Sequence, residues 1–237
     1  MLYLIPTPVG NLEDMTLRGL RIMKEVQVIL AEDTRTSGQL LKHFEIKTPL
    51  KPFHAHNEHY QIDNLMDQLK SGIDMALISD AGTPGISDPG FLLVRACHQH
   101  GVPISVLPGA TAFVPALVAS GLPCDRFHFE GFLPHKKGRQ TRLKYLTKLP
   151  ETVILYESPH RLLKCLAEFA EFSDLQRQAC VVREISKIYE SVKTGTIEFL
   201  IKYYQEHPSE VRGEIVILFE GATEIKKEKK KYNNSEE

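Results

Sequence analysis

The chain has 237 residues, enough for one large domain or two small ones, since domains commonly run about 100 to 200 residues. Hydrophobic residues make up 42% and charged residues 25%, and the formal net charge is −1. No overall charge therefore drives binding to nucleic acid or membrane, and contact with a polyanion requires a local basic patch.

Export and metal-binding signals are missing from the sequence. The first residues carry no basic n-region, and no run of about 18 apolar residues occurs. The four cysteines form no C-x-x-C pair, which argues against a disulfide framework or a zinc finger. We expect a cytoplasmic protein that does not associate with a membrane.

In the first half, short apolar runs alternate with helical stretches. Strands are expected at 2–5, 28–31, 75–79 and 104–107, and helices from 16, at 37–44, at 57–71 and from 91. Thr16 and Asn57 are plausible helix N-caps. This βαβα order predicts a parallel sheet, because parallel strands need long crossover connections.

The loop from Ser79 to Gly90 interrupts this pattern directly after an apolar run. It holds three glycines, two prolines and two carboxylates. Loops at the carboxyl ends of parallel strands are where open α/β sheets bind small molecules, and glycine lets the backbone approach a ligand closely. The alternative is a long turn without a ligand.

The second half is richer in strands and is expected to form a mixed sheet. Thr111 is a plausible cap for a helix at 112–121, with Pro115 in its first turn, and 122–125 looks like a crossing between halves. Strands are expected at 127–129, 152–156, 179–184, 189–194 and 214–219, and helices at 141–149, 159–169 and 196–207. We predict an N-terminal α/β domain at 1–113, a C-terminal α/β domain at 114–222 and a disordered, charged tail at 223–237.

The first loop, 6–14, follows a strand and precedes a helix, as nucleotide-binding turns do. It contains neither G-x-G-x-x-G nor G-x-x-x-x-G-K-[ST], and it lacks the tight G-x-G of the common methyltransferases. Dinucleotide binding and P-loop phosphate binding are therefore poorly supported.

Eight segments taken in order resemble the small-subunit ribosomal RNA methyltransferase I (RsmI) family, within the tetrapyrrole-methylase-like superfamily. They are 7–12, 31–35, 56–58, 79–90, 108–110, 130–134, 156–161 and 212–214, and the resemblance spans residues 2 to about 221. It implies an α/β, two-domain class III methyltransferase fold, with an N-terminal parallel sheet and a C-terminal mixed sheet. It also implies a homodimer that binds S-adenosylmethionine between the domains and 2′-O-methylates a cytidine in the decoding centre of 16S rRNA.

Positional comparison with that family assigns the methyl-donor contacts. Thr83 stands where related methylases carry the carboxylate of a Gly-Asp-Pro loop, and Asp80 lies three residues earlier. For each of these residues the alternative is a tight turn at a strand end. The expected donor contacts are Pro8, Asp80, Gly82, Thr83, Pro84, Ile86, Ser87, Gly109, Ala110, Thr111, Ala112 and Tyr156.

The acidic and basic residues that end the second strand are the candidate catalytic groups. A ribose hydroxyl attacks a methyl group only as its proton is removed, so a base within hydrogen-bond reach is required. Glu32 or Asp33 can serve as that base, while Arg35 holds a neighbouring phosphate. A structural ion pair between Asp33 and Arg35 is the alternative.

Two further segments are candidates for binding rRNA. His56, Asn57 and Glu58 match the family and are expected on the substrate side of the cleft, although helix capping alone can explain Asn57. The neighbouring histidines are not a favoured metal site, since no second ligand cluster is evident. A basic segment supplies the local patch required above, with a solvated helix face as the alternative. Its members are Lys136, Lys137, Arg139 and Arg142, joined by Arg161 at a later helix start.

The same residues allow two alternative functions. One alternative keeps the superfamily and changes the acceptor to a tetrapyrrole or another small molecule, which would not require the basic segment. Another is a ribosome-binding factor that senses the methyl donor without using it.

Overall fold

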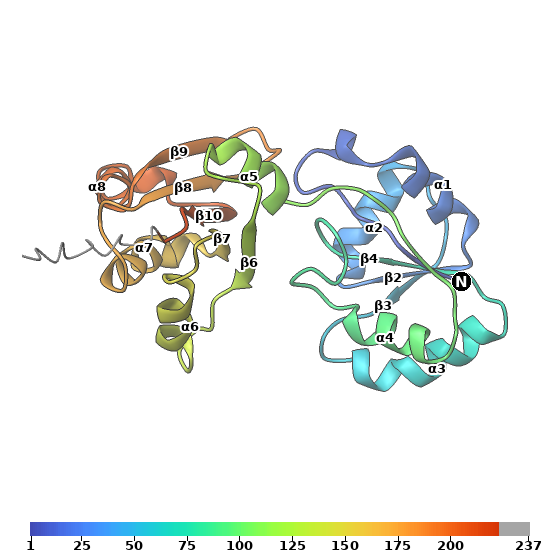
Figure 1. The fold of residues 1–237 in the computed structure, drawn as a ribbon. Coiled ribbons are helices and arrows are strands. Elements are labelled where there is room, and N and C mark those ends of the chain that lie inside the picture. The colour runs from blue at the N-terminus through green and yellow to red at the C-terminus, as the bar shows by residue number, and fades with distance from the viewer. Residues whose placement is uncertain (223–237) are drawn as a thin grey trace, which may run out of the picture.

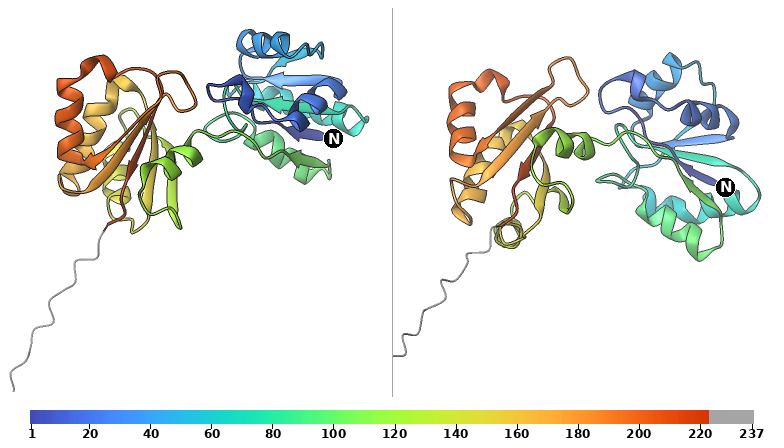
Figure 2. Two further views of the ribbon diagram at one scale, coloured as in Figure 1. Left: turned by 90° about the horizontal axis from the view of Figure 1, so that it is seen from above. Right: turned by 45° about the horizontal axis from the view of Figure 1, so that its top comes forward.

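The computed structural model describes residues 1–222, and the predicted disordered tail at 223–237 lies outside the described residues. The chain forms two lobes, each built around its own five-stranded sheet (Figure 1). We call residues 1–107 the N-terminal lobe and residues 113–222 the C-terminal lobe. The segment after the fifth strand crosses between them, as both views of Figure 2 show.

The N-terminal sheet is wholly parallel, as predicted. Its strands run in the order β3-β2-β4-β1-β5. Both β2 and β4 are buried over their whole length, because helices cover both faces of the sheet. The strands are β1 (Leu2–Leu4), β2 (Val28–Ala31), β3 (Leu50–Pro52), β4 (Met75–Ile78) and β5 (Ile104–Val106).

Two helices pack on each face of this sheet. On one face lie α1 (Leu17–Glu25) and α2 (Thr34–His43), and on the other α3 (Glu58–Lys70) and α4 (Phe91–Gln99). A short 3₁₀ turn, η1 (Leu12–Asp14), precedes α1. The predicted cap at Thr16 is confirmed, since its side chain accepts a hydrogen bond from the N–H of Gly19.

The C-terminal sheet is mixed, as predicted, in the order β6-β7-β10-β8-β9 with only β6 and β7 parallel. On one face pack α6, α7 and α8, and on the other α5. The strands are β6 (Phe127–Phe132), β7 (Thr152–Glu157), β8 (Gln178–Arg183), β9 (Ser191–Thr196) and β10 (Ile215–Phe219). The helices are α5 (Phe113–Ser120), α6 (Arg139–Leu146), α7 (Leu162–Glu171) and α8 (Ile197–Glu206), with 3₁₀ turns η2 (Pro159–Arg161) and η3 (Pro208–Glu210).

Several predicted boundaries were wrong, each for a local reason. Helix α2 begins three residues before Ser37, because Asp33 caps it by accepting from the N–H of Arg35. Thr111 is not a cap: Ala112 occupies that position, and no side chain caps α5. Strand β3 was not predicted. The division at 113/114 stays a prediction, which is supported by the packing of α5 on the second sheet.

Within residues 1–222 no helix has the length and apolar character needed to span a membrane.

Candidate active site

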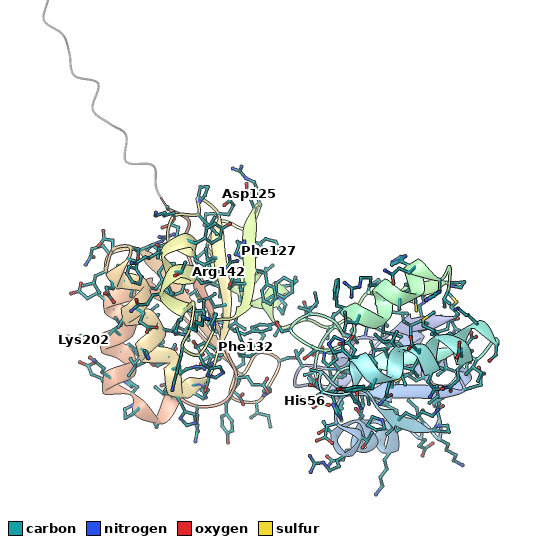
Figure 3. All side chains as sticks on the ribbon, turned by 90° about the horizontal axis from the view of Figure 1, so that it is seen from below. His56, Asp125, Phe127, Phe132, Arg142 and Lys202 are labelled. Atoms are coloured by element: carbon teal, nitrogen blue, oxygen red, sulfur yellow. The ribbon has the colours of Figure 1, made fainter. Side chains whose placement is uncertain are left out.

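A cleft of about 460 Å³ lies between the lobes, and we call it the interlobe cleft. The N-terminal lobe contributes loops from the carboxyl ends of β1, β2 and β4. The C-terminal lobe contributes the ends of β6 and β7 and the beginning of β10, which are neighbours because β7 and β10 are antiparallel. Figure 3 shows Phe132 and His56 at the facing edges of the two lobes.

The loop after β4 is fixed to the first loop by backbone pairing. Thr7 and Gly82 exchange two N–H···O bonds of 2.9 Å, and the hydroxyl of Thr7 donates to the carbonyl of Ser79 at 2.9 Å. Thr83 donates to the carbonyl of Ala110 at 3.0 Å. This bond joins the loop to residues 108–112, which connect the two lobes and which we call the interlobe segment. Gly82 has φ +81°, a backbone conformation that favours glycine. The loop therefore presents a fixed backbone surface to the cleft.

The far end of this loop is held by Glu58. Its carboxylate accepts from the N–H of Gly90 at 3.2 Å and from that of Leu92 at 3.0 Å. The negative charge thus caps α4 at its positive end, from a side chain on α3. Glu58 is buried in this role and does not line the cleft, contrary to its predicted contact with rRNA.

The other two residues of that segment also act locally. The side-chain oxygen of Asn57 accepts from the N–H of His54 at 2.8 Å, and its amide donates to the carbonyl of Pro52 at 3.3 Å. These bonds shape the turn that leads into α3, although Asn57 makes no side-chain cap bond to the helix itself. His56 is exposed at the edge of its lobe (Figure 3).

Three carboxylates of the N-terminal lobe line the cleft: Glu32, Asp80 and Asp88. Burial raises the pKa of Glu32, and the nearby charge of Asp80 raises it further. Burial also raises the pKa of Asp88 to about 6, with repulsion from Glu32 as the second cause. Within residues 1–222 no group of His, Cys, Asp and Glu side chains has the arrangement of a metal site. The cleft therefore holds two carboxylates whose raised pKa makes each a better proton acceptor than an exposed carboxylate, and that of Asp88 is about 6.

Asp33 and Arg35 do not line the interlobe cleft. The Arg35 guanidinium donates to both carboxylate oxygens of Asp33, with the shortest bond at 2.6 Å. These bonds lower the pKa of Asp33 to about 2, so this group is a poor base. The N–H of Asp33 donates to Asp80 at 3.1 Å, which ties the beginning of α2 to the cleft carboxylates.

The C-terminal wall of the cleft is formed around Tyr156 and Phe132. Burial raises the pKa of Tyr156 to about 12, so its hydroxyl stays protonated. Strand β6 is bulged between Phe129 and Gly131, where Gly131 has φ +71°. A Cβ at Gly131 would lie 2.9 Å from the Ser87 hydroxyl of the other lobe, so the two walls meet closely at this point.

Behind this wall lies a buried cluster of charges. Glu157, which lines the cleft, accepts from Arg139 at 3.2 Å, from Arg161 at 2.7 Å and from the N–H of Ser158 at 2.9 Å. Arg139 also donates to Glu168 at 2.7 Å. These bonds hold the end of β7 in place and satisfy a carboxylate that is otherwise fully buried.

The predicted basic patch was wrong for Arg139 and Arg142, because both pair with carboxylates. Arg139 is only 3% exposed, so it is an internal ion-pair partner and not a surface contact for RNA. Arg142 is half-buried and pairs with Glu130, with its Nε 2.5 Å from Oε1. Of the predicted members, only Lys136 and Lys137 are exposed and form no ion pair with another described residue.

The predicted donor contacts divide into two groups. Eight line the interlobe cleft: Asp80, Gly82, Thr83, Ile86, Ser87, Thr111, Ala112 and Tyr156. Pro8, Pro84, Gly109 and Ala110 do not line it. Asp88 was missed although it lies in the loop singled out from the sequence, and the chain order gave no sign that Ile185 would reach the same cleft. Glu214 lies in segment 212–214, which was noted for the family resemblance but was given no role in the site.

Comparison with known proteins agrees with this geometry. A family model described as Tetrapyrrole (Corrin/Porphyrin) Methylases matches residues 1–201. Ribosomal RNA small subunit methyltransferase I of Synechocystis sp. is 46% identical over 224 residues, which cover 94% of this chain and 80% of that protein. The protein of the same name from Pseudomonas aeruginosa is 45% identical and covers 93% and 78% respectively. The chain belongs to the ribosomal RNA small subunit methyltransferase I family.

This family consists of S-adenosylmethionine-dependent methyltransferases within the tetrapyrrole methylases, so the chain is a methyl-transferring enzyme, as predicted. Solved structures share its fold. Uroporphyrin-III C-methyltransferase from Thermus thermophilus superposes with a TM-score of 0.63 at 23% identity, covering 92% of this chain and 93% of that one. A structure of the Thermus enzyme with S-adenyl homocysteine gives 0.63 at 21% identity, with coverage of 92% and 96%. Diphthine synthase gives 0.72 at 14% identity, with coverage of 92% and 89%. These likenesses confirm the predicted fold class.

Proposed function

We propose that this member of the ribosomal RNA small subunit methyltransferase I family transfers a methyl group from S-adenosylmethionine to the ribose 2′-hydroxyl of a cytidine in 16S rRNA. The small ribosomal subunit, in the cytoplasm, is the substrate. The observation that carries the proposal is the interlobe cleft, in which glycine-rich backbone and proton-accepting carboxylates face one another. The names of the close relatives supply the acceptor class.

The lining of the cleft fits this methyl donor. S-adenosylmethionine carries a sulfonium cation and no phosphate. Among the described residues that line the cleft there is no Lys or Arg, whereas five are acidic: Glu32, Asp80, Asp88, Glu157 and Glu214. Arg139 and Arg161 pair with Glu157, and Lys187 pairs with Glu214, so the negative character of the cleft comes mainly from the three carboxylates of the N-terminal lobe. This balance favours a cation and disfavours a nucleotide phosphate. The volume of about 460 Å³ lies within the usual range for small-ligand sites, about 300–1,000 Å³.

Specific residues would hold the donor. Gly82, Thr83, Ile86 and Ser87 would contact it from the N-terminal lobe, with Thr111 and Ala112 from the interlobe segment. Tyr156 would close the site from β7. A bound S-adenyl homocysteine in the Thermus enzyme of the same fold supports this assignment.

The chemistry needs a base and an in-line arrangement of oxygen, methyl carbon and sulfur. The bond from sulfur to methyl breaks as the bond from the 2′-oxygen to methyl forms, which leaves S-adenosylhomocysteine. The hydroxyl proton goes to a carboxylate. Glu32 and Asp88 fit this role because burial raises the pKa of both, whereas Asp33 is held ionised by Arg35.

Homodimer formation is also proposed. An apolar surface on the C-terminal lobe is formed by Val114 and Val118 of α5 and by Phe127 of β6, which are all exposed. A second copy would cover this surface. The Val118→Asp variant should shift the protein from dimer to monomer in light scattering coupled to gel filtration.

Transfer of labelled methyl groups to ribosomal subunits tests the main proposal. The protein is incubated with methyl-labelled S-adenosylmethionine and small subunits that lack the modification, and the rRNA is digested to nucleosides for mass spectrometry. Labelled 2′-O-methylcytidine is expected. Label in a tetrapyrrole acceptor but none in rRNA would assign the enzyme to a different acceptor class.

A further inference from the structure

A second, smaller hollow adjoins the interlobe cleft, and we call it the α2 hollow. It has a volume of about 260 Å³, with Ser79 and Asp80 at the end of β4 among its lining residues. Asp80 also lines the interlobe cleft. One carboxylate therefore belongs to both spaces, and a ligand in the α2 hollow would meet the cleft at this residue.

The walls of the α2 hollow combine apolar and polar side chains. The first loop provides Pro8 and Leu12, and α2 provides Leu40 together with Gln39 and His43. The amide of Gln39 offers both a donor and an acceptor, and the His43 ring can do the same. Apolar side chains beside groups of both hydrogen-bond types suit a nucleobase, which has apolar faces and polar edges.

An unsatisfied group lies in the same wall. Ser37 lines the α2 hollow and is only 2% exposed, yet its hydroxyl has no hydrogen-bond partner among the described residues. Buried hydroxyls in folded proteins almost always have a partner. The missing partner is consistent with a polar ligand in this wall.

The positive charge of Arg35 lies near the α2 hollow, since the next residue, Thr36, lines it. Arg35 stands at the beginning of α2, and its side chain is 88% exposed beyond its ion pair with Asp33. Water screens an exposed ion pair of this kind, so the guanidinium can exchange the carboxylate for a phosphate at little cost. Such an exchange would place an RNA phosphate beside the hollow.

We propose that the α2 hollow binds the target nucleoside of the RNA, splayed out of its strand, with the pyrimidine base along α2 and the ribose toward Asp80. This inference rests on the proposed function and deepens it by locating the acceptor. A space of about 260 Å³ lies below the usual range for cofactors, which suits a single nucleoside. Enzymes that modify one nucleotide commonly extrude it from its helix or act on unpaired strands, and RNA bases in such segments are read along their edges. The boundary at Asp80 then brings the 2′-hydroxyl to the carboxylates of the interlobe cleft.

Filling the hollow tests the proposal. Gln39→Trp places a large ring on an exposed position of α2, and Gln99→Trp is the matched control at an exposed position of α4 that lines neither space. Gln39→Trp should lower kcat/KM for small subunits at least tenfold while the Kd for S-adenosylmethionine stays within twofold of wild type. Gln99→Trp should change neither value, and both variants should melt near the wild-type temperature. Unchanged methylation by Gln39→Trp, or an equal loss of donor affinity, would overturn the assignment.

Binding of cytidine 5′-monophosphate separates this inference from the proposed function. The wild-type protein crystallised with S-adenosylhomocysteine and this nucleotide should show it in the α2 hollow, and Gln39→Trp should show none there. If the nucleotide occupies the hollow but rRNA is not methylated, the nucleoside site is confirmed and rRNA is rejected as the acceptor. Nucleotide bound only elsewhere would reject the site, whatever the activity.

Discussion

Asp88 differs from the other cleft carboxylates in how much its ionisation costs the folded protein. Its pKa is about 6 when folded and near 3.8 when exposed. Well below pH 3.8 the carboxyl is neutral in both states. Between the two pKa values it is ionised in the unfolded chain but still protonated in the folded protein, so stability falls as the pH rises toward 6. Above the folded pKa the loss is complete, at about 1 kcal/mol after allowance for screening by water.

Asp88→Asn should therefore be more stable than wild type at pH 8 and nearly equal to it at pH 4, as measured by thermal unfolding. If Asp88 takes the hydroxyl proton, the same variant should lose about 10²- to 10⁴-fold in kcat, with the Kd for the donor unchanged. Wild-type kcat/KM should rise with pH up to about 6 and then level off. A variant that keeps wild-type kcat would leave Glu32 as the base, and Glu32→Gln is the companion measurement.

At the level of single residues, the sequence singled out the loop after β4 and Glu32, which both line the interlobe cleft, but it did not indicate the roles of the charged groups. Arg139 and Arg142 look alike in a basic segment, and only packing shows that Arg139 faces Glu157 inside the lobe. Asp88 was visible in the loop. What raises its pKa is burial together with repulsion from Glu32, which lies 56 positions earlier, and no local pattern encodes that proximity.

Arg139 is buried and Lys136 is exposed, so we expect substitution of the first to affect stability and substitution of the second to affect rRNA binding. Arg139→Ala should lower the free energy of unfolding by about 3 kcal/mol, because it removes a partner from two carboxylates in the interior. Lys136→Ala, its exposed counterpart, should leave stability unchanged. It should weaken rRNA binding and reduce the slope of log affinity against log salt by about 1. Equal loss of stability in both variants would contradict the burial of Arg139.

At the level of elements, Glu58 couples α3 to the loop that faces the cleft. Glu58→Ala leaves the N–H groups of Gly90 and Leu92 without their acceptor, which should cost about 1–2 kcal/mol. Because these residues end the loop, the Kd for the donor should also rise. Glu58→Gln keeps an acceptor oxygen and should recover most of both losses, whereas Asp63→Ala at an exposed position of α3 should have neither effect. Calorimetric unfolding and donor titration measure the two quantities.

The hydrophobic pattern of the sequence predicted most of the helices and strands. The features that it missed depend on contacts between distant segments. Strand β3 has three residues and ends in Pro52, and it exists because β2 offers it an edge. The cap of α4 comes from another helix, so the residues around Gly90 carry no capping signal of their own. Such elements are fixed by tertiary partners and not by local propensity.

At the level of the whole molecule, the two lobes meet where Gly131 approaches Ser87. Gly131→Ala adds a Cβ 2.9 Å from the Ser87 hydroxyl, so the lobes must shift or Ser87 must rotate away. The Kd for the donor should rise several-fold. Gly121→Ala is the matched control, since Gly121 has φ +70° but no atom within 4 Å of the new Cβ. Both variants should lose about 1 kcal/mol from backbone strain. A similar effect of both on donor binding would mean that backbone strain, and not the contact, sets the affinity.

The two-sheet architecture was predictable from the order of strands, but the meeting of the lobes was not. Contacts such as that of Gly10 with the Lys187 loop, or of the Ser186 hydroxyl with Asp14, join segments more than 170 residues apart. Their geometry depends on positive φ angles at Glu184 and Ser186 that no turn motif in the sequence indicated.

The position of β10 has a consequence for synthesis of the chain. This strand is the last element within residues 1–222, yet it runs through the middle of its sheet between β7 and β8, and its first residues line the cleft. The N-terminal lobe can complete its sheet while the rest is still being translated, whereas the second sheet remains split until residue 219 has left the ribosome. A nascent chain that stops before Ile215 exposes two unpaired strand edges, which invites aggregation. The proposed donor site is thus the last part of the described protein to form.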